Sequence, residues 1–101
     1  MKTLGTHNYF VYILTNKNKT VLYIGVTNNL KNRLLYHQTN DSTKLSFTSK
    51  YKCYYLIYFE HFTEINQAIK REKQLKGWLR SKKERLITAF NPTWNFLNDT
   101  V

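Results

Sequence analysis

The sequence predicts an α+β fold, in which a small three-stranded antiparallel sheet is flanked by helices in the order β-β-α-β-α-α. Two observations lead to this prediction. Three short runs are rich in aromatic and β-branched residues, and apolar residues outside these runs recur at helical spacing. The chain of 101 residues is long enough for one core, so we expect a single domain over residues 1–101, with its core at about 9–97.

The first two strands are expected to form a hairpin. Residues 9–15 read Tyr-Phe-Val-Tyr-Ile-Leu-Thr, and residues 20–26 read Thr-Val-Leu-Tyr-Ile-Gly-Val. The residues between them, Asn-Lys-Asn-Lys, are polar, as a turn requires. Gly25 interrupts the second run, which predicts either a bulge or a close approach of another group to the backbone.

A first helix should begin near residues 27–29, which offer N-cap side chains, and continue to about residue 38. One face of that helix carries Leu30, Arg33, Leu34 and His37. The polar residues 39–52 predict a long loop, and a loop of this length in a compact domain more often has a function than not.

A third strand is expected at residues 53–60 and is followed by two more helices. The first of these begins at residues 63–64, and Gly77 ends or bends it. Its apolar stripe consists of Ile65, Ala68, Ile69, Leu75 and Leu79. Residues 81–84 have the spacing of a capping box before a last helix at 85–90. Residues 91–92, Asn-Pro, stop this helix, so that Trp94, Phe96 and Leu97 fold back on the core.

Positive charge is the strongest feature of the composition. Sixteen Lys and Arg against six Asp and Glu give a formal net charge of +10, which attracts polyanions. Nucleic acid is the commonest such partner, an anionic membrane surface is the second, and plain solubility is the alternative. Half of the basic residues cluster in one segment, which favours a nucleic-acid partner: Lys70, Arg71, Lys73, Lys76, Arg80, Lys82, Lys83 and Arg85.

Several classes of protein are excluded by the same composition. The single cysteine, Cys53, excludes a disulfide framework and a cysteine-based zinc site, and is typical of a reducing compartment. No apolar run approaches the roughly 18 residues that span a bilayer, and the first residues lack the apolar segment of a secretory signal. We therefore expect a cytoplasmic protein with no membrane partner.

Polar side chains occupy helix faces that are otherwise apolar. Arg33 and His37 lie one turn apart beside leucines, and Glu72 interrupts the stripe of the second helix. A charge that faces a core is costly unless it is paired or functional. The structural alternative is a buried Arg33–Glu72 salt bridge with His37 at its boundary, or a Glu72 that faces solvent.

Two tyrosines of the hairpin, Tyr12 and Tyr23, complete a set that would suit phosphodiester cleavage if the fold brought it together. Such a reaction needs a base for water, a cation at the developing phosphorane charge and a metal for the leaving oxygen. A single carboxylate suits Mg²⁺, which keeps several waters. Tyrosines that serve only as strand formers are the alternative.

The order and spacing of these residues resemble the GIY-YIG nuclease domain. Phe10-Val11-Tyr12 is followed after ten residues by Tyr23-Ile24-Gly25, and then by Arg33, His37 and Glu72. The resemblance covers about residues 9–97 and is strongest to the small stand-alone bacterial branch of the family. This branch is similar to the nuclease core of the excision-repair incision subunit and of phage homing endonucleases.

The resemblance implies a role for each matching residue. Tyr12 and Tyr23 match the tyrosines of which one is proposed as general base and the other orients water or phosphate. Arg33 matches the arginine that stabilises phosphate charge, and His37 the position that takes a proton from the base. Glu72 matches the sole protein ligand of Mg²⁺ or Mn²⁺. Gly25 matches the glycine that lets the backbone approach the site.

The sequence departs from the family pattern at two positions, and it offers three further candidate site residues. Phe10 stands where the family name has glycine, and Val26 where some relatives carry lysine. Asn95 is a candidate for the polar tail residue that completes the site in relatives, and Lys50 and Tyr51 are candidates for contact with substrate.

We therefore predict a metal-dependent DNA endonuclease that selects structure rather than sequence. The alternatives are a non-catalytic nucleic-acid-binding module on the same fold and a small basic adaptor of ribosomes or repair proteins. Targeting would come from the basic segment of residues 70–85, from a homodimer or from a protein partner.

Overall fold

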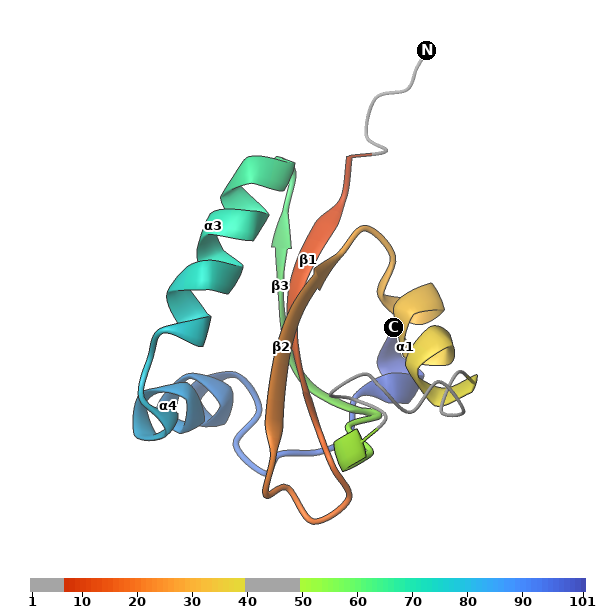
Figure 1. Ribbon diagram of the computed structural model, residues 1–101, viewed down its shortest axis with the longest axis vertical. Coiled ribbons are helices and arrows are strands. Elements are labelled where there is room, and N and C mark those ends of the chain that lie inside the picture. The colour runs from red at the N-terminus through yellow and green to blue at the C-terminus, as the bar shows by residue number, and fades with distance from the viewer. Residues whose placement is uncertain (1–6, 40–49) are drawn as a thin grey trace.

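The computed structural model describes residues 7–39 and 50–101. The predicted α+β fold is confirmed, with three antiparallel strands and helices on both sides of the sheet (Figure 1). In chain order the elements are β1 (Tyr9–Thr15), β2 (Leu22–Thr27), α1 (Leu30–Thr39), β3 (Tyr55–Phe62), α3 (Ile65–Lys76), α4 (Arg80–Phe90) and the 3₁₀ turn η2 (Asn98–Thr100).

The strand order is β2-β1-β3, so β1 is central and β2 forms one edge of the sheet. Figure 1 shows α3 and α4 on one face, and α1 with the C-terminal segment on the other. Val11 and Ile13 of β1 are buried in the core cluster that also holds Ala68, Leu75 and Ile87 of α3 and α4. The alternate residues Tyr12 and Leu14 are buried in a second cluster with Leu30 and Leu34 of α1. The full burial of β1 follows from these two layers, because each face of the strand meets a helix.

The C-terminal segment is tied to β3 by asparagine side chains. Asn98 accepts from the backbone N–H of Leu56 at 2.9 Å and donates to the carbonyl of Tyr54 at 2.8 Å. Asn91, which is buried, donates to the carbonyl of Ile57 at 3.0 Å. The predicted return of the tail to the core is thus confirmed, and hydrogen bonds to the strand hold it there as well as apolar contacts.

Two expectations about helices were wrong. The last helix begins at Arg80 rather than near residue 85, because Leu79 is its N-cap, with an extended backbone. Ser81 therefore lies inside the first turn, and no side chain caps this helix. Leu79 is also not part of the α3 stripe, since α3 ends at Lys76 and Gly77 caps it. The strands also start later than predicted, by two residues in both β2 and β3.

Most of the loop expected at residues 39–52 lies outside the described residues. Within the described ranges, no helix has the length and apolar character needed to cross a membrane.

Candidate active site

The β1–β2 hairpin brings the two predicted tyrosines to one face of the sheet. Tyr12 pairs with Gly25 across the hairpin, and Tyr23 lies two positions before Gly25 in β2, diagonally opposite Tyr12. The ring centroids of Tyr12 and Tyr23 are 6.4 Å apart. Tyr12 is only 1% exposed, whereas Tyr23 is half-buried on the edge strand.

Gly25 makes room for the side chain of Tyr12. A Cβ atom at Gly25 would lie 2.5 Å from the Tyr12 hydroxyl oxygen and 2.6 Å from its Cζ. The close approach that the sequence predicted at this glycine is therefore made by the phenol ring of the facing strand. The glycine fixes where the Tyr12 hydroxyl lies.

Helix α1 supplies Arg33. Its first turn is capped by Asn29, whose side-chain oxygen accepts from the N–H of Asn32 at 2.9 Å, while the buried Leu30 and Leu34 anchor the helix on the sheet. Arg33 is half-buried, and its guanidinium carbon lies 5.9 Å from the centre of the Tyr36 ring. His37 follows Arg33 by one turn, and its side chain lies outside the described part of the structure.

Helix α3 supplies Glu72 from the other face of the sheet. The Glu72 side chain is 16% exposed and accepts from the ammonium of Lys76 at 3.0 Å, so the Arg33–Glu72 salt bridge considered as an alternative is replaced by a pair within α3. Lys76 also lines a hollow with Tyr23 and Lys83. The α3 residues therefore reach the edge of the sheet formed by β2.

The electrostatic surroundings of Tyr12 connect these elements. Burial raises the pKa of the Tyr12 phenol well above its ordinary value, Tyr23 raises it further, the positive charge of Arg33 lowers it, and the charge of Glu72 raises it. Tyr12 therefore keeps its proton at neutral pH unless further positive charge or a proton acceptor comes close. Four predicted site residues, from β1, β2, α1 and α3, are thus near enough to influence one phenol.

Some side chains of the basic segment at residues 70–85 bind other residues of the protein. Arg71 binds the carboxylate of Glu60, with 2.9 Å between Nη2 and Oε2, and donates to Gln74. Glu60 also accepts from the hydroxyl of Tyr58. The sequence analysis missed this role of Glu60, although a carboxylate that alternates with Tyr58 and Phe62 along a strand was a signal for an inward-facing pair.

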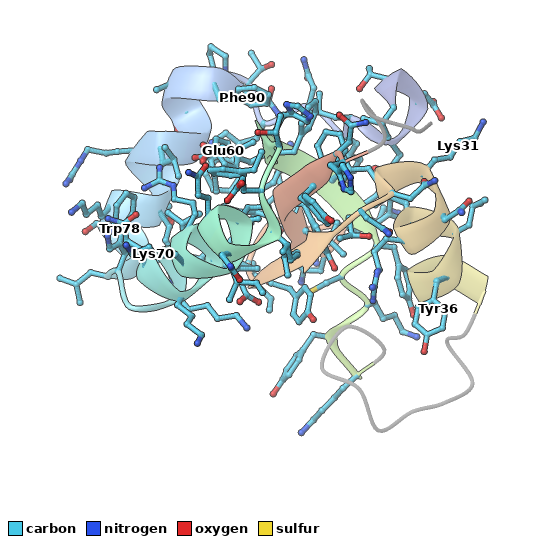
Figure 2. The ribbon with its side chains drawn as sticks, turned by 90° about the horizontal axis from the view of Figure 1, so that it is seen from above. Lys31, Tyr36, Glu60, Lys70, Trp78 and Phe90 are labelled. Atoms are coloured by element: carbon cyan, nitrogen blue, oxygen red, sulfur yellow. The ribbon has the colours of Figure 1, made fainter. Side chains whose placement is uncertain are left out.

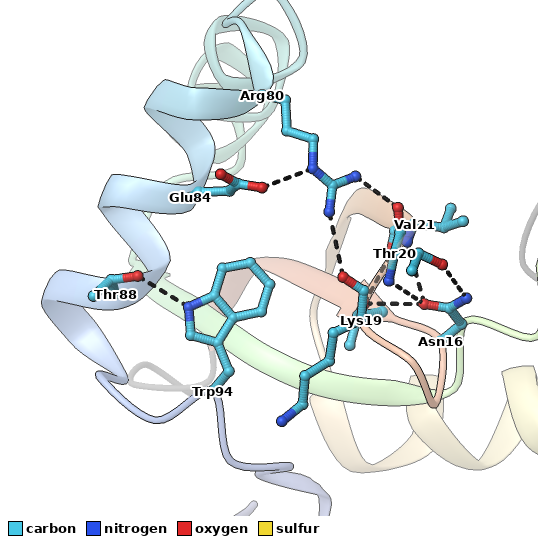
Figure 3. Close-up of polar contacts among 9 residues, drawn as sticks. Asn16, Lys19, Thr20, Val21, Arg80, Glu84, Thr88 and Trp94 are labelled. Carbon is cyan, nitrogen blue, oxygen red and sulfur yellow. Dashed lines mark hydrogen bonds and ion pairs between the residues drawn. The ribbon is translucent and has the colours of Figure 1, made fainter.

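Arg80 clamps the β1–β2 turn to α4 (Figure 3). It donates to the carbonyls of Thr20 at 2.7 Å and Lys19 at 3.3 Å, and it pairs with Glu84 at 2.9 Å. The remaining basic residues of the segment differ in environment. Lys70, Lys73 and Arg85 are exposed, Lys83 is half-buried, and the ammonium of Lys82 lies 4.2 Å from the centre of the Trp78 ring.

The structure also describes the surroundings of the three additional candidates, Lys50, Tyr51 and Asn95. Lys50 and Tyr51 contact each other, with 5.4 Å between the ammonium and the ring centre. The backbone of Asn95 is held by Asn91, whose side chain also bonds to Ile57, which places Asn95 beside β3 rather than β2.

A polar hollow that the sequence analysis missed lies beside Arg33. It has a volume of about 290 Å³ and is lined by Thr27, Asn28, Asn29, Asn32, Arg33 and Tyr36. Residues 27–29 were interpreted only as helix caps, and nothing in the spacing indicated a concave surface.

Comparison with known proteins places this arrangement in a family. The GIY-YIG catalytic domain model matches residues 8–85. The chain belongs to the GIY-YIG family. A UPF0213 protein of Bacillus pumilus is 33% identical over 81 residues, which are 80% of each chain. A UPF0213 protein of Clostridium perfringens is 36% identical over 80 residues, 79% of this chain and 83% of that one.

A solved structure agrees with both the family and the fold. The solution NMR structure of a UPF0213 protein from Bacillus halodurans has a TM-score of 0.51 and 27% sequence identity, and the match covers 81% of this chain and 84% of that one. The predicted resemblance to small stand-alone GIY-YIG proteins is therefore confirmed. Membership of this nuclease family implies a nucleic-acid partner.

Proposed function

We propose that this GIY-YIG protein is an endonuclease that hydrolyses DNA phosphodiester bonds with Mg²⁺ or Mn²⁺ and selects DNA structure rather than sequence. The observation that carries the proposal is the grouping of residues from four elements around the Tyr12 phenol: the rings of Tyr12 and Tyr23 are neighbours, and the charges of Arg33 and Glu72 both act on the pKa of this phenol. A module that only binds nucleic acid needs cations but not this set of groups.

The protein's own residues divide the reaction between them. Arg33 offers a planar guanidinium that grips two phosphate oxygens and stabilises the charge that develops on the phosphorane. One tyrosine accepts the proton of the attacking water as its own phenolic proton passes to an acceptor, and the other tyrosine orients the water or the phosphate. Because burial raises the pKa of Tyr12, its use as a base requires a proton acceptor, and His37, one turn beyond Arg33, is the residue we propose for that task.

Glu72 is the proposed metal ligand. Within the described residues no group of three or more His, Cys, Asp or Glu could hold a metal ion, and in the family pattern that this chain resembles the protein contributes one carboxylate. This fits Mg²⁺, which keeps most of its water ligands and takes one or two carboxylates. A cation bound there supplies positive charge for the leaving oxygen. In the structure the ammonium of Lys76 pairs with the Glu72 carboxylate and supplies its counter-charge.

The proposed indifference to sequence follows from contacts of the basic groups with phosphates. Such contacts carry no sequence information, so the affinity should depend steeply on salt and hardly on sequence. Lys70 and Lys73 are exposed cations of α3, the helix that carries Glu72, and Figure 2 shows Lys70 on the outer side of this helix.

The test is cleavage of labelled flap and nicked DNA by the wild type, Glu72→Gln and Glu64→Gln with Mg²⁺ or Mn²⁺. We expect metal-dependent products from the wild type and from Glu64→Gln, which changes an exposed carboxylate just before the same helix, and none from Glu72→Gln. Tyr12→Phe and Tyr23→Phe should each slow cleavage about 100-fold or more without weakening binding.

Two results would contradict this proposal. Equal cleavage by the wild type and Glu72→Gln would mean that Glu72 holds no catalytic metal. Binding at low salt by both proteins without cleavage of any branched, nicked or paired substrate would favour the binding module.

A further inference from the structure

We propose that the polar hollow beside Arg33 binds one unpaired nucleotide of the substrate strand, with Tyr36 as the surface on which its base stacks. This inference rests on the proposed function, because it assumes that Arg33 holds a substrate phosphate. It goes further in naming the feature of the DNA that the protein selects: an unstacked base next to that phosphate.

The hollow has the groups that hold a single nucleotide. Tyr36 is 53% exposed although it is a large aromatic residue, and Figure 2 shows it on the outer side of α1. Tyr36 borders the hollow together with Arg33. Aromatic side chains that bind single strands stack on bases in this way. The guanidinium of Arg33 lies 5.9 Å from the ring centre, so that the phosphate-binding and base-binding groups are neighbours.

The remaining lining is suited to the edge of a base. Asn28 and Asn32 are exposed at the hollow, and each carries an amide that both donates and accepts hydrogen bonds. Asn29 is committed within the helix, since its side-chain oxygen accepts from the N–H of Asn32. An apolar ligand would leave these amides unsatisfied, whereas a nucleobase has polar groups along its edge and an apolar face for Tyr36.

The geometry of DNA supplies the selectivity. A base inside a duplex is stacked on both faces, so it can reach Tyr36 only after it is unpaired, which costs a few kcal/mol. A base in a flap, gap or branch has already lost this stacking. Such sites should therefore bind through both the phosphate and the base, while intact duplex binds through phosphates alone.

The experiment measures binding without divalent metal, so that cleavage does not interfere. The probes are a flap oligonucleotide with 2-aminopurine in its single-stranded arm and a fully paired duplex of the same sequence. The proteins are the wild type, Tyr36→Ala, Tyr36→Leu, Tyr36→Phe and Leu35→Ala. Leu35 is the matched control, because it is 51% exposed on the same helix but lines a different hollow.

We expect the wild type and Tyr36→Phe to quench 2-aminopurine and to bind the flap equally well. Tyr36→Ala and Tyr36→Leu should lose the quenching and bind the flap about tenfold more weakly, the effect of losing one stacked base, with duplex affinity unchanged. Leu35→Ala should behave as the wild type. Tyr36→Leu keeps apolar bulk on α1 and therefore separates stacking from helix stability.

Unchanged flap binding by Tyr36→Ala, or an equal loss on flap and duplex, would overturn the inference. Its failure is distinguishable from that of the nuclease proposal. If the protein cleaves DNA through Glu72 but binds flaps equally well without Tyr36, only this inference fails. If the protein never cleaves DNA but Tyr36 is needed to quench 2-aminopurine, the nuclease proposal fails and this inference stands.

Discussion

Tyr12 and Gly25 face each other across the β1–β2 hairpin, and the absence of a side chain at Gly25 lets the phenol of Tyr12 lie against its backbone. Tyr12 is buried, so its ring has little room to move aside. The pair therefore fixes the position of a proposed catalytic hydroxyl by packing. A glycine needed for space is the reason that the strand carries this weak strand former.

We predict that Gly25→Ala destabilises the fold by about 1–3 kcal/mol, because the new methyl group would overlap the Tyr12 ring in a packed core. Urea unfolding followed by circular dichroism measures this change. Gly77→Ala is the control, since the nearest atoms to its Cβ would be 3.6 Å and 3.8 Å away and its φ is −82°. Equal stability of Gly25→Ala and the wild type would show that Tyr12 moves freely.

At the scale of elements, one arginine joins the hairpin turn to a helix far away in the chain. Arg80 begins α4 and donates to backbone carbonyls of the turn between β1 and β2 (Figure 3). The turn is also organised from within, where the side-chain oxygen of Asn16 accepts from the N–H of Thr20 at 2.8 Å. The position of the two strands that carry the tyrosines is therefore coupled to α4.

We predict that Arg80→Ala lowers the free energy of unfolding by about 1 kcal/mol, a modest loss because the side chain is partly exposed to water. Arg80→Lys should recover little of it, since an ammonium cannot reproduce the fork that reaches two carbonyls. Urea unfolding measures the change, and Arg85→Ala removes the same charge from an exposed position of α4. Equal losses at positions 80 and 85 would mean that only charge matters.

At the scale of the whole molecule, buried acids make the fold sensitive to high pH. Burial raises the pKa of the Tyr12 and Tyr58 phenols above their ordinary value near 10, and the neighbouring carboxylate of Glu60 adds to the effect at Tyr58. Burial likewise raises the pKa of the Cys53 thiol to about 11. In the unfolded chain these groups lose their protons at lower pH than in the fold.

The folded protein therefore binds more protons than the unfolded chain between the two sets of pKa values, and stability falls as pH rises. The stability that these protonated groups add to the fold is fully present below about pH 9. It is lost as pH rises through the raised pKa of each group. Urea unfolding at a series of pH values measures the decline. Cys53→Ala and Tyr58→Phe should each flatten it, although both cost stability at pH 7. If the free energy of unfolding of both variants fell with pH as steeply as that of the wild type, Cys53 and Tyr58 would not be the cause of the decline.

Local patterns were enough to predict most of the fold and the members of the candidate site. The run of aromatic and β-branched residues at 9–15 was enough to predict β1, because strand formation depends on neighbours along the chain. The family motif identified Tyr12, Tyr23, Arg33 and Glu72. Helix ends were predicted less well. Arg80 begins α4 where a capping box suggested a later start, and contacts of the Arg80 side chain with the β1–β2 turn hold this helix end in place.

Partners distant in sequence were decided by the tertiary structure. Sequence patterns were sufficient to predict the order of strands and helices and the family, and they showed that Arg33, His37 and Glu72 carry polar groups on apolar faces. Only packing decided that Arg80 reaches the carbonyls of the β1–β2 turn, that Arg71 meets Glu60, and that Gly25 lies against the Tyr12 phenol. Periodicity specifies which face of an element is buried, but the group it meets depends on how the helices lie across the sheet.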